Sequence, residues 1–113
     1  MLSKANRLTK EADFKLLAKK GRPFYSSLFT IKLLKSKDTD SRFGVVISSK
    51  VSKKAVVRNK IKRRITEVIR LSMPKIKSGF DVMILVKSIV AEKSYQEIKE
   101  DIEKLFKKAQ LLK

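Results

Sequence analysis

AVVRNKIKRRITEVIR, residues 55–70, carries the pattern from which the architecture of this chain follows. At about 100° per residue, one set of apolar side chains in this stretch falls within roughly 40° of a single line along a helix. The set is Val57, Ile61, Ile65 and Val68. The pattern predicts an amphipathic helix over about residues 52–71, whose apolar seam packs on the rest of the domain.

Outside its apolar seam, the predicted helix has a broad cationic surface. Its basic side chains are Arg58, Lys60, Lys62, Arg63, Arg64 and Arg70, with Lys53 and Lys54 at its start and Glu67 as its single acid. Like charges packed this closely repel one another, so the surface is favoured mainly where a polyanion lies against it. A solvated charged face is the ordinary interpretation of a few surface lysines. So many cations against one carboxylate, inside a basic chain, instead indicate nucleic-acid binding.

The charge of the whole chain supports the same interpretation. Its 113 residues hold 29 Lys and Arg against 11 Asp and Glu, a formal net charge of +18. A nucleic acid offsets such charge, because each neutralised phosphate releases condensed counterions. With 42% hydrophobic residues, the chain is too apolar for a disordered basic tail. We expect a single folded domain over residues 1–113, since a chain of this length buries about two thirds of its surface.

An anionic membrane surface is the other polyanion that a basic chain could bind. No segment approaches the roughly 18 consecutive apolar residues of a spanning helix, and the first residues lack the apolar core of a signal peptide. The chain contains no Cys, which excludes disulfides and thiolate metal sites and fits a reducing compartment. We therefore expect a cytoplasmic protein without a membrane partner.

Upstream of the cationic helix, the sequence predicts one helix and two strands. The helix covers about residues 10–19, with Thr9 as its N-cap and Gly21 as a left-handed stop. Alternating apolar and polar side chains then predict strands over residues 29–33 and 43–48.

The remaining elements are indicated by a loop, a glycine, an apolar run and a capping motif. The polar residues 35–41 lie between the two strands and predict the loop of a β-hairpin. Gly44, in the second strand, predicts a bulge or a close backbone approach. After the cationic helix, the apolar run of residues 82–86 is typical of a strand covered on both faces. The last helix begins at Ser94, in a capping box with Glu97.

The predicted order of elements is therefore helix, strand, strand, cationic helix, strand, helix. No internal repeat, low-complexity segment or linker interrupts it. This order favours an α+β domain, with one small mixed sheet and helices packed on it.

Catalysis by the side chains of this protein alone is not expected. The sequence contains no His and no Cys, so the commonest general base and the thiolate nucleophile are both missing. The acids that could form a carboxylate metal site are spread over a helix, a loop and a strand start, where capping and turns explain them. They are Asp13, Asp38, Asp40 and Asp81. We predict neither a catalytic residue nor a metal site of the protein's own.

The residues from Ser49 to Ile65, SKVSKKAVVRNKIKRRI, closely resemble the signature of the bacterial ribonuclease P protein component. That signature is Ser-Lys-Lys-x-Gly, a short spacer and then Arg-Asn-Arg-x-Lys-Arg. Residues 6–14, NRLTKEADF, and the segment from Phe80-Asp81 to Lys87 are similar to the family's first segment and last strand. The resemblance spans nearly the whole chain in the same order of elements.

The resemblance implies a function in tRNA maturation. The family's protein binds a large catalytic RNA, and together they remove the 5′ leader from precursor tRNA. The RNA performs the hydrolysis with Mg²⁺, held mainly by the RNA and its substrate, so the protein needs no catalytic side chain. The partners expected are this catalytic RNA and the leader, and neither DNA nor a membrane. The resemblance also implies a left-handed β-α-β crossover through the cationic helix, against the usual right-handed rule.

The resemblance further assigns residues to the two RNAs. Those at the start and on the outer face of the cationic helix contact the catalytic RNA, and they are Lys53, Lys54, Arg58, Asn59, Lys60, Lys62 and Arg63. Phe14, Lys50 and Lys87 lie toward the cleft that holds the leader, where an aromatic ring stacks on a base and lysines meet phosphates. From pattern alone, a residue such as Phe14 is more often part of the core than a stacking surface.

The sequence departs from the family pattern at several positions. Lys60 stands in place of the second Arg of the motif and lacks the bidentate fork of a guanidinium. Thr66 stands where an Arg is common. Ala18 occupies the place of a second aromatic residue, which leaves stacking on the leader to Phe14.

Two other functions are compatible with the residues. A ribosomal protein or a binder of double-stranded RNA would share the cationic helix, but it would not need the motif order Arg-Asn-Lys-x-Lys-Arg. A metal-dependent nuclease acting alone would cleave RNA without an RNA partner. Recognition of helical DNA would need a helix-turn-helix spacing, which the sequence lacks.

Overall fold

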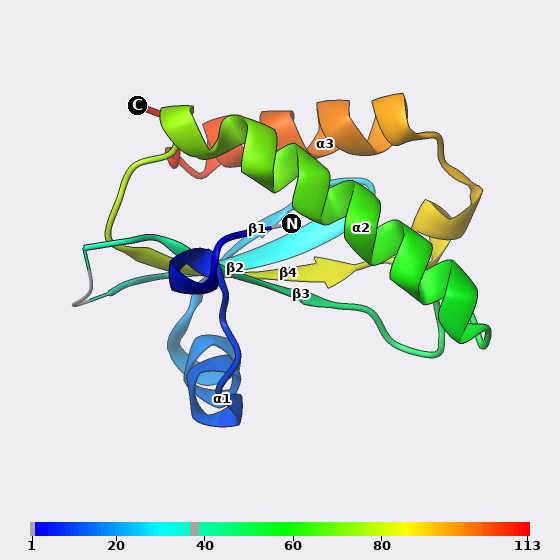
Figure 1. Cartoon of the computed structure of the whole chain (residues 1–113), viewed down its shortest axis with the longest axis horizontal. Coiled ribbons are helices and arrows are strands. Elements are labelled where there is room, and N and C mark those ends of the chain that lie inside the picture. The colour runs from blue at the N-terminus through cyan, green and yellow to red at the C-terminus, as the bar shows by residue number, and fades with distance from the viewer. Residues whose placement is uncertain (1, 37–38) are drawn as a thin grey trace.

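The structure is a computed structural model that describes residues 2–36 and 39–113. Within these residues, a four-stranded sheet carries helices on both faces (Figure 1). The helices are α1 (Glu11–Lys20), α2 (Ala55–Ser72) and α3 (Tyr95–Lys108), and the strands are β1 (Arg22–Tyr25), β2 (Phe29–Lys35), β3 (Arg42–Val46) and β4 (Phe80–Val86). Short 3-10 helices cover Lys4–Asn6, Met73–Lys75 and Ser88–Glu92. The predicted α+β class is confirmed.

The strands lie in the order β1-β2-β4-β3. β1 pairs with β2 and β2 pairs with β4 in antiparallel fashion, whereas β3 runs parallel to β4. Because α2 connects β3 to β4, these three elements form a parallel β-α-β unit. The hand of this crossover stays a prediction. The central strand β4 is covered on both faces, as its apolar run predicted, with Val82, Met83 and Ile84 all buried.

One strand, β1, was not predicted. It is only four residues long and lies at the edge of the sheet, where it pairs with β2 from Arg22 to Tyr25. Such a short strand leaves no room for a clear apolar–polar alternation, and Pro23 argues against a strand everywhere except at an edge. The order of elements is therefore helix, three strands, helix, strand, helix.

The predicted hairpin with its loop at residues 35–41 is wrong. β2 and β3 both pair with β4, which lies between them, so β2 and β3 are not neighbours and do not form a hairpin. Residues 37 and 38 of the predicted loop lie outside the described residues. A polar segment indicates only that the chain turns. The strand between β2 and β3 is β4, which follows α2 in the sequence, so the residues near the loop carry no signal for it.

Both predicted ends of the first helix need correction. Its N-cap is Lys10 and not Thr9, and no side chain caps it. Gly21 is extended, with φ −64° and ψ 141°, and is not left-handed. The glycine is needed for space, because a Cβ there would stand 2.4 Å from the carbonyl oxygen of Leu17 and 2.8 Å from the Cβ of Lys32. Gly21 therefore allows the backbone at the end of α1 to pack closely against β2.

The predicted capping box at the start of α3 is confirmed. The Glu97 amide donates to the Ser94 hydroxyl at 3.2 Å, and the Ser94 amide donates to the Glu97 carboxylate at 3.4 Å. Two amides that the helix itself cannot bond are thereby satisfied.

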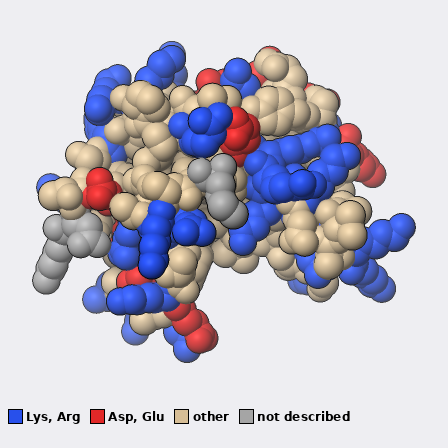
Figure 2. All heavy atoms as spheres, in the orientation of Figure 1, with Lys and Arg blue, Asp and Glu red and all other residues tan. Residues whose placement is uncertain are grey.

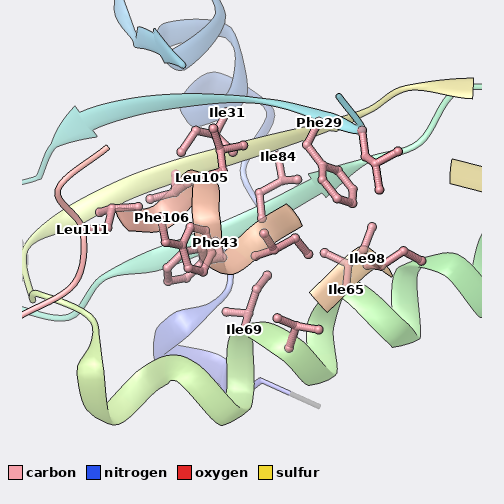
Figure 3. Close-up of a cluster of buried hydrophobic side chains, with 14 of the residues drawn as sticks. Phe29, Ile31, Phe43, Ile65, Ile69, Ile84, Ile98, Leu105, Phe106 and Leu111 are labelled. Carbon is pink, nitrogen blue, oxygen red and sulfur yellow. The ribbon is translucent and has the colours of Figure 1, made fainter. Parts of the chain in front are cut away.

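The main core lies between the sheet and the helices α2 and α3 (Figure 3). The apolar seam of α2 points into it as predicted, with Val57 half-buried. The fully buried apolar residues of the helix are Ile61, Ile65, Val68 and Ile69. Phe43 of β3 and Phe106 of α3 meet there with their ring centroids 5.9 Å apart. Each such side chain contributes roughly 1.5–3 kcal/mol on burial, so packing fixes which side of α2 faces outward.

A smaller cluster on the opposite face of the sheet holds α1. Its buried members are Leu8, Leu17 and Met83, with Phe14, Leu34 and Leu85 packed against them. An ionic link adds to it. Arg42 of β3 donates through Nε and Nη2 to the carboxylate of Asp81, at 2.9 and 2.8 Å, and its Nη1 lies 3.5 Å from the carboxylate of Asp13 on α1. α1 is thus attached separately from the main core.

Candidate nucleic-acid interface

The outward side of α2 presents most of the cationic residues that the sequence singled out. The exposed residues of the predicted set are Lys53, Lys54, Asn59, Lys60, Lys62 and Arg63. Figure 2 shows Lys and Arg side chains spread over this face of the molecule, with few Asp and Glu among them. Among residues 2–36 and 39–113, the five cationic side chains of this set form no ion pair, and they are Lys53, Lys54, Lys60, Lys62 and Arg63. Their donors are therefore available to a partner.

Arg58 differs from these residues because it is half-buried. Its Nη1 donates to the carbonyl oxygen of Ser52 at 2.7 Å, which braces the turn that leads into α2. Arg64 is likewise half-buried, and its Nη1 lies 3.4 Å from the carbonyl oxygen of Lys93. Arg58 therefore supports the local structure in addition to its predicted RNA contact.

A cleft of about 840 Å³ lies beside the edge strand β3, between α2 and the segment that precedes α1. The amide of Leu8 donates to the carbonyl oxygen of Phe43 at 2.9 Å and holds that segment against β3. Polar side chains of α2 form one wall of the cleft, and they are Asn59, Lys62, Arg63, Thr66 and Glu67. The other walls include Leu8, Phe14, Gly44 and Val45.

Phe14 lines this cleft with its ring set against the backbone of Gly44. A Cβ at position 44 would stand 2.4 Å from two atoms of the Phe14 ring, so only glycine fits there. The predicted close backbone approach at Gly44 is confirmed, and the approaching group is the ring of Phe14. Phe14 is half-buried, which leaves part of the ring accessible from the cleft.

Glu67 brings the single carboxylate of α2 into the same cleft. Arg70, on the next turn of the helix, donates from Nε to one carboxylate oxygen at 3.1 Å and from Nη2 to the other at 2.5 Å. These hydrogen bonds lower the pKa of Glu67 and raise that of Arg70. The carboxylate is therefore ionised and fixed in place.

The three residues predicted for the leader cleft are not all brought together. Phe14 lines the cleft, but Lys50 and Lys87 do not. Lys50 is exposed in the turn that follows β3. Lys87 is exposed at the end of β4, where its Nζ donates to the carbonyl oxygen of Ser26 at 2.5 Å. The structure instead groups Phe14 with residues of the predicted surface for the catalytic RNA.

Two residues of the α2 wall of the cleft, Thr66 and Glu67, were not among the predicted site residues. The helical spacing could have indicated them. Thr66 follows Asn59 by seven residues and Glu67 follows Arg63 by four, and residues at these spacings lie on the same side of a helix. The cleft itself could not be predicted, since its opposite wall comes from the segment before α1 and from β3.

Across residues 2–36 and 39–113, no three Asp, Glu, His or Cys side chains gather as a metal site would require. No helix in the same part of the chain has the length and apolarity to cross a membrane.

Comparison with known proteins identifies the family. The sequence model of the Ribonuclease P family matches residues 2–110. The ribonuclease P protein component of Pseudanabaena sp. is 34% identical over 113 residues, which cover 99% of this chain and 97% of that protein. The corresponding protein of Synechocystis sp. is 38% identical over 112 residues, covering 98% and 90%.

Solved structures of the same family superpose closely. The Staphylococcus aureus RNase P protein matches with a TM-score of 0.90 and 29% identity, covering 97% of this chain and 100% of that one. A mutant of the S. aureus protein with defective mRNA degradation activity matches with a TM-score of 0.89 and 30% identity, covering 96% and 92%. The Thermotoga maritima RNase P protein gives a TM-score of 0.83 and 29% identity, covering 91% and 96%.

A protein component of ribonuclease P belongs to a ribonucleoprotein that acts in tRNA processing, so it has an RNA partner. The cationic outer side of α2 is chemically suited to one. Given the match over nearly its whole length and relatives above 30% identity, this chain belongs to the ribonuclease P protein component family.

Proposed function

We propose that this chain binds the catalytic RNA of ribonuclease P together with the 5′ leader of precursor tRNA, and that it assists removal of the leader. The observation that carries the proposal is the surface of α2, where exposed cations without protein partners adjoin a cleft with an aromatic wall. Cations neutralise phosphates, and aromatic rings stack on unpaired bases. A single surface of this kind suits RNA that is partly unpaired.

The outer side of α2 is the proposed contact for the catalytic RNA. Lys53, Lys54, Lys60, Lys62 and Arg63 are exposed and can each neutralise a phosphate. Asn59 adds an amide that can bond to a base edge or a phosphate. Arg58 can reach RNA only with the N–H groups that its bond to Ser52 leaves over.

The leader is proposed to lie against Phe14, Lys50 and Lys87. The half-buried ring of Phe14 offers a stacking surface, and the two exposed lysines offer charge to phosphates. Because Lys50 and Lys87 lie outside the cleft, a leader that contacts all three residues would extend past the cleft.

Hydrolysis is assigned to the RNA subunit, with Mg²⁺ held mainly by that RNA and by the substrate. The protein's part is electrostatic and positional: it neutralises charge where two polyanions must come together, which lowers the Mg²⁺ concentration that their assembly needs. It would act in the cytoplasm, where precursor tRNA is made.

The test is a cleavage assay on precursor tRNA at low Mg²⁺ concentration. Three reactions are compared: the protein alone, a bacterial ribonuclease P RNA alone, and both together. Cleavage at the leader junction that is much faster with both supports the proposal. No stimulation of a competent RNA would instead indicate a ribosomal type of RNA binder.

The protein-alone reaction is also run on an mRNA, because one similar structure is of an S. aureus mutant defective in mRNA degradation. Cleavage of either substrate without the RNA subunit would contradict the assignment of catalysis to the RNA.

A further inference from the structure

We infer that Arg70, near the end of α2, binds a phosphate group of the RNA partner, and that Glu67 positions its guanidinium for this contact. The inference rests on the proposed function, because it requires an RNA partner. It extends the RNA interface beyond Arg63, the last residue of the predicted contact set on α2.

Arg70 continues the outward row of α2 that is proposed to face the catalytic RNA. Asn59, Arg63, Thr66 and Arg70 follow one another at intervals of four, three and four residues, so they lie on one side of the helix. At a rise of about 1.5 Å per residue, Arg70 lies about 10 Å beyond Arg63 along the helix axis. Its side chain is 49% exposed. Arg70 is therefore the next cation that an RNA strand meets when it follows this row past Arg63.

The hydrogen bonds to Glu67 leave one complete edge of the Arg70 guanidinium free. A guanidinium has two parallel pairs of N–H groups, one on Nε and Nη2 and the other on Nη1 and Nη2. Glu67 accepts from Nε at 3.1 Å and from Nη2 at 2.5 Å, which uses the first pair. Within residues 2–36 and 39–113, no other group hydrogen-bonds to the side chain of Arg70. The second pair is therefore available to two oxygens of one phosphate, an acceptor that matches this fork.

Glu67 fixes the direction in which the free N–H pair points. An unrestrained arginine side chain has several rotatable bonds, and it loses their freedom when it binds a phosphate. Because Glu67 already holds the plane of the guanidinium, part of this loss precedes RNA binding. The Glu67 carboxylate lies on a different edge of the guanidinium from the free pair, so both anions can be bound at once.

An ordinary ion pair on the helix surface predicts the opposite effect of removing Glu67. A cation in the last turn of α2 complements the helix dipole and pairs with a carboxylate three residues earlier without any ligand. In that case, loss of the Glu67 charge makes the surface more cationic and RNA binding tighter. If Glu67 positions Arg70, its loss weakens RNA binding although the surface becomes more cationic.

The affinity for the catalytic RNA, measured over a range of salt concentrations, tests the phosphate contact. Arg70→Ala should weaken binding by about tenfold and lower the slope of log affinity against log salt by about one unit. Arg70→Lys keeps the charge but lacks the fork, so it should keep the slope and still bind less tightly than wild type. Lys107→Ala removes the same charge from an exposed position of α3 and should retain the wild-type affinity and slope.

Glu67→Gln tests the positioning role. Glutamine has the same size but offers one uncharged oxygen, so it cannot hold both N–H groups. We expect binding to weaken by about threefold, because Arg70 regains freedom that binding must remove, and not to weaken in an Arg70→Ala background. Glu103→Gln removes the same charge from an exposed position of α3 and should not weaken binding. Circular dichroism checks that every variant is folded.

The outcomes are distinct. Lower affinity and slope in Arg70→Ala, with weaker binding by Glu67→Gln only where Arg70 is present, support the inference. Wild-type affinity of Arg70→Ala, or lower affinity with an unchanged slope, overturns the phosphate contact. Binding by Glu67→Gln at or above the wild-type affinity overturns the positioning role. The proposed function stands in these cases, because the wild-type protein still binds the catalytic RNA; failure of the wild-type protein to bind it would overturn the proposed function as well.

Discussion

The ring of Phe14 on α1 lies against Gly44 of the edge strand β3. The ring of Phe14 occupies the space in which any larger residue at position 44 would place its Cβ. The sequence predicted a close approach at Gly44 but not the group that makes it. It also left Phe14 between a core role and a stacking role, and the half-buried ring is compatible with both.

Gly44→Ala is expected to lower the free energy of unfolding by about 1–3 kcal/mol, because the added methyl group overlaps the Phe14 ring. In a Phe14→Ala background the same change should cost less than about 1 kcal/mol, since the ring is gone. Urea denaturation of the four proteins in this cycle measures the coupling. Equal costs in the two backgrounds would show that the ring is not the obstacle.

Phe14→Ala also tests stacking on the leader. If the ring stacks on a leader base, the change should weaken binding of leader-bearing precursor tRNA to the reconstituted ribonucleoprotein by about 1–3 kcal/mol and leave binding of mature tRNA unchanged. Affinities for the two RNAs are compared at one salt concentration. An equal loss for both would assign Phe14 to packing alone.

Among the elements, α1 depends on an ionic link that the sequence did not reveal. Arg42 joins the buried Asp81 of β4 to Asp13 of α1, and these residues come from three distant parts of the chain. Arg42→Ala should cost roughly 3 kcal/mol of stability, because it leaves the Asp81 carboxylate buried and unpaired. Asp13→Asn should cost under about 1 kcal/mol, because Asp13 is partly exposed.

Urea denaturation provides the measurement for both variants. Lys15→Ala is the matched control, since it breaks the highly exposed Lys15–Glu11 pair on the same helix and should change little. A cost for Arg42→Ala no larger than that of the control would contradict a structural role for the link.

The capping box of α3 predicts a dependence of stability on pH. Hydrogen bonds from the backbone and hydroxyl of Ser94 lower the pKa of Glu97 below its ordinary value of 4.5. A carboxylate whose pKa is lower in the folded state stabilises that state above its unfolded pKa. This contribution is lost as the pH falls from about 4.5 through the lower folded value.

The urea midpoints of wild type and Glu97→Gln are therefore expected to converge as the pH is lowered below about 4.5. Glu103→Gln, also an exposed acid of α3, serves as the control. A constant difference between wild type and Glu97→Gln across the acid range would contradict the capping explanation.

The sequence predicted the elements whose signals lie within their own residues. The apolar seam predicted α2, the capping box predicted the start of α3, and the apolar run predicted the buried β4. Local signals did not predict β1, which is short and contains Pro23. They also misplaced the ends of α1, because Gly21 is needed for close packing against β2 and not for a left-handed turn.

In the whole molecule, the arrangement of the strands and the position of the cleft could not be predicted from local pattern. β4 follows α2 in the sequence but lies between β2 and β3 in the sheet, so the strand pairing depends on contacts between distant segments. The cleft arises for the same reason, because its walls come from α2, β3 and the segment before α1. The cationic surface was predicted because it lies on a single helix.

The affinity of the protein for the catalytic RNA, measured over a range of salt concentrations, tests the proposed interface most directly. Lys62→Ala with Arg63→Ala should weaken binding and reduce the slope of log affinity against log salt by about one unit for each lost phosphate contact. The control, Lys104→Ala with Lys107→Ala on α3, removes the same charge elsewhere and should keep the wild-type slope. An unchanged slope in the α2 variant, or an equal reduction in the control, would contradict RNA binding by the outer side of α2.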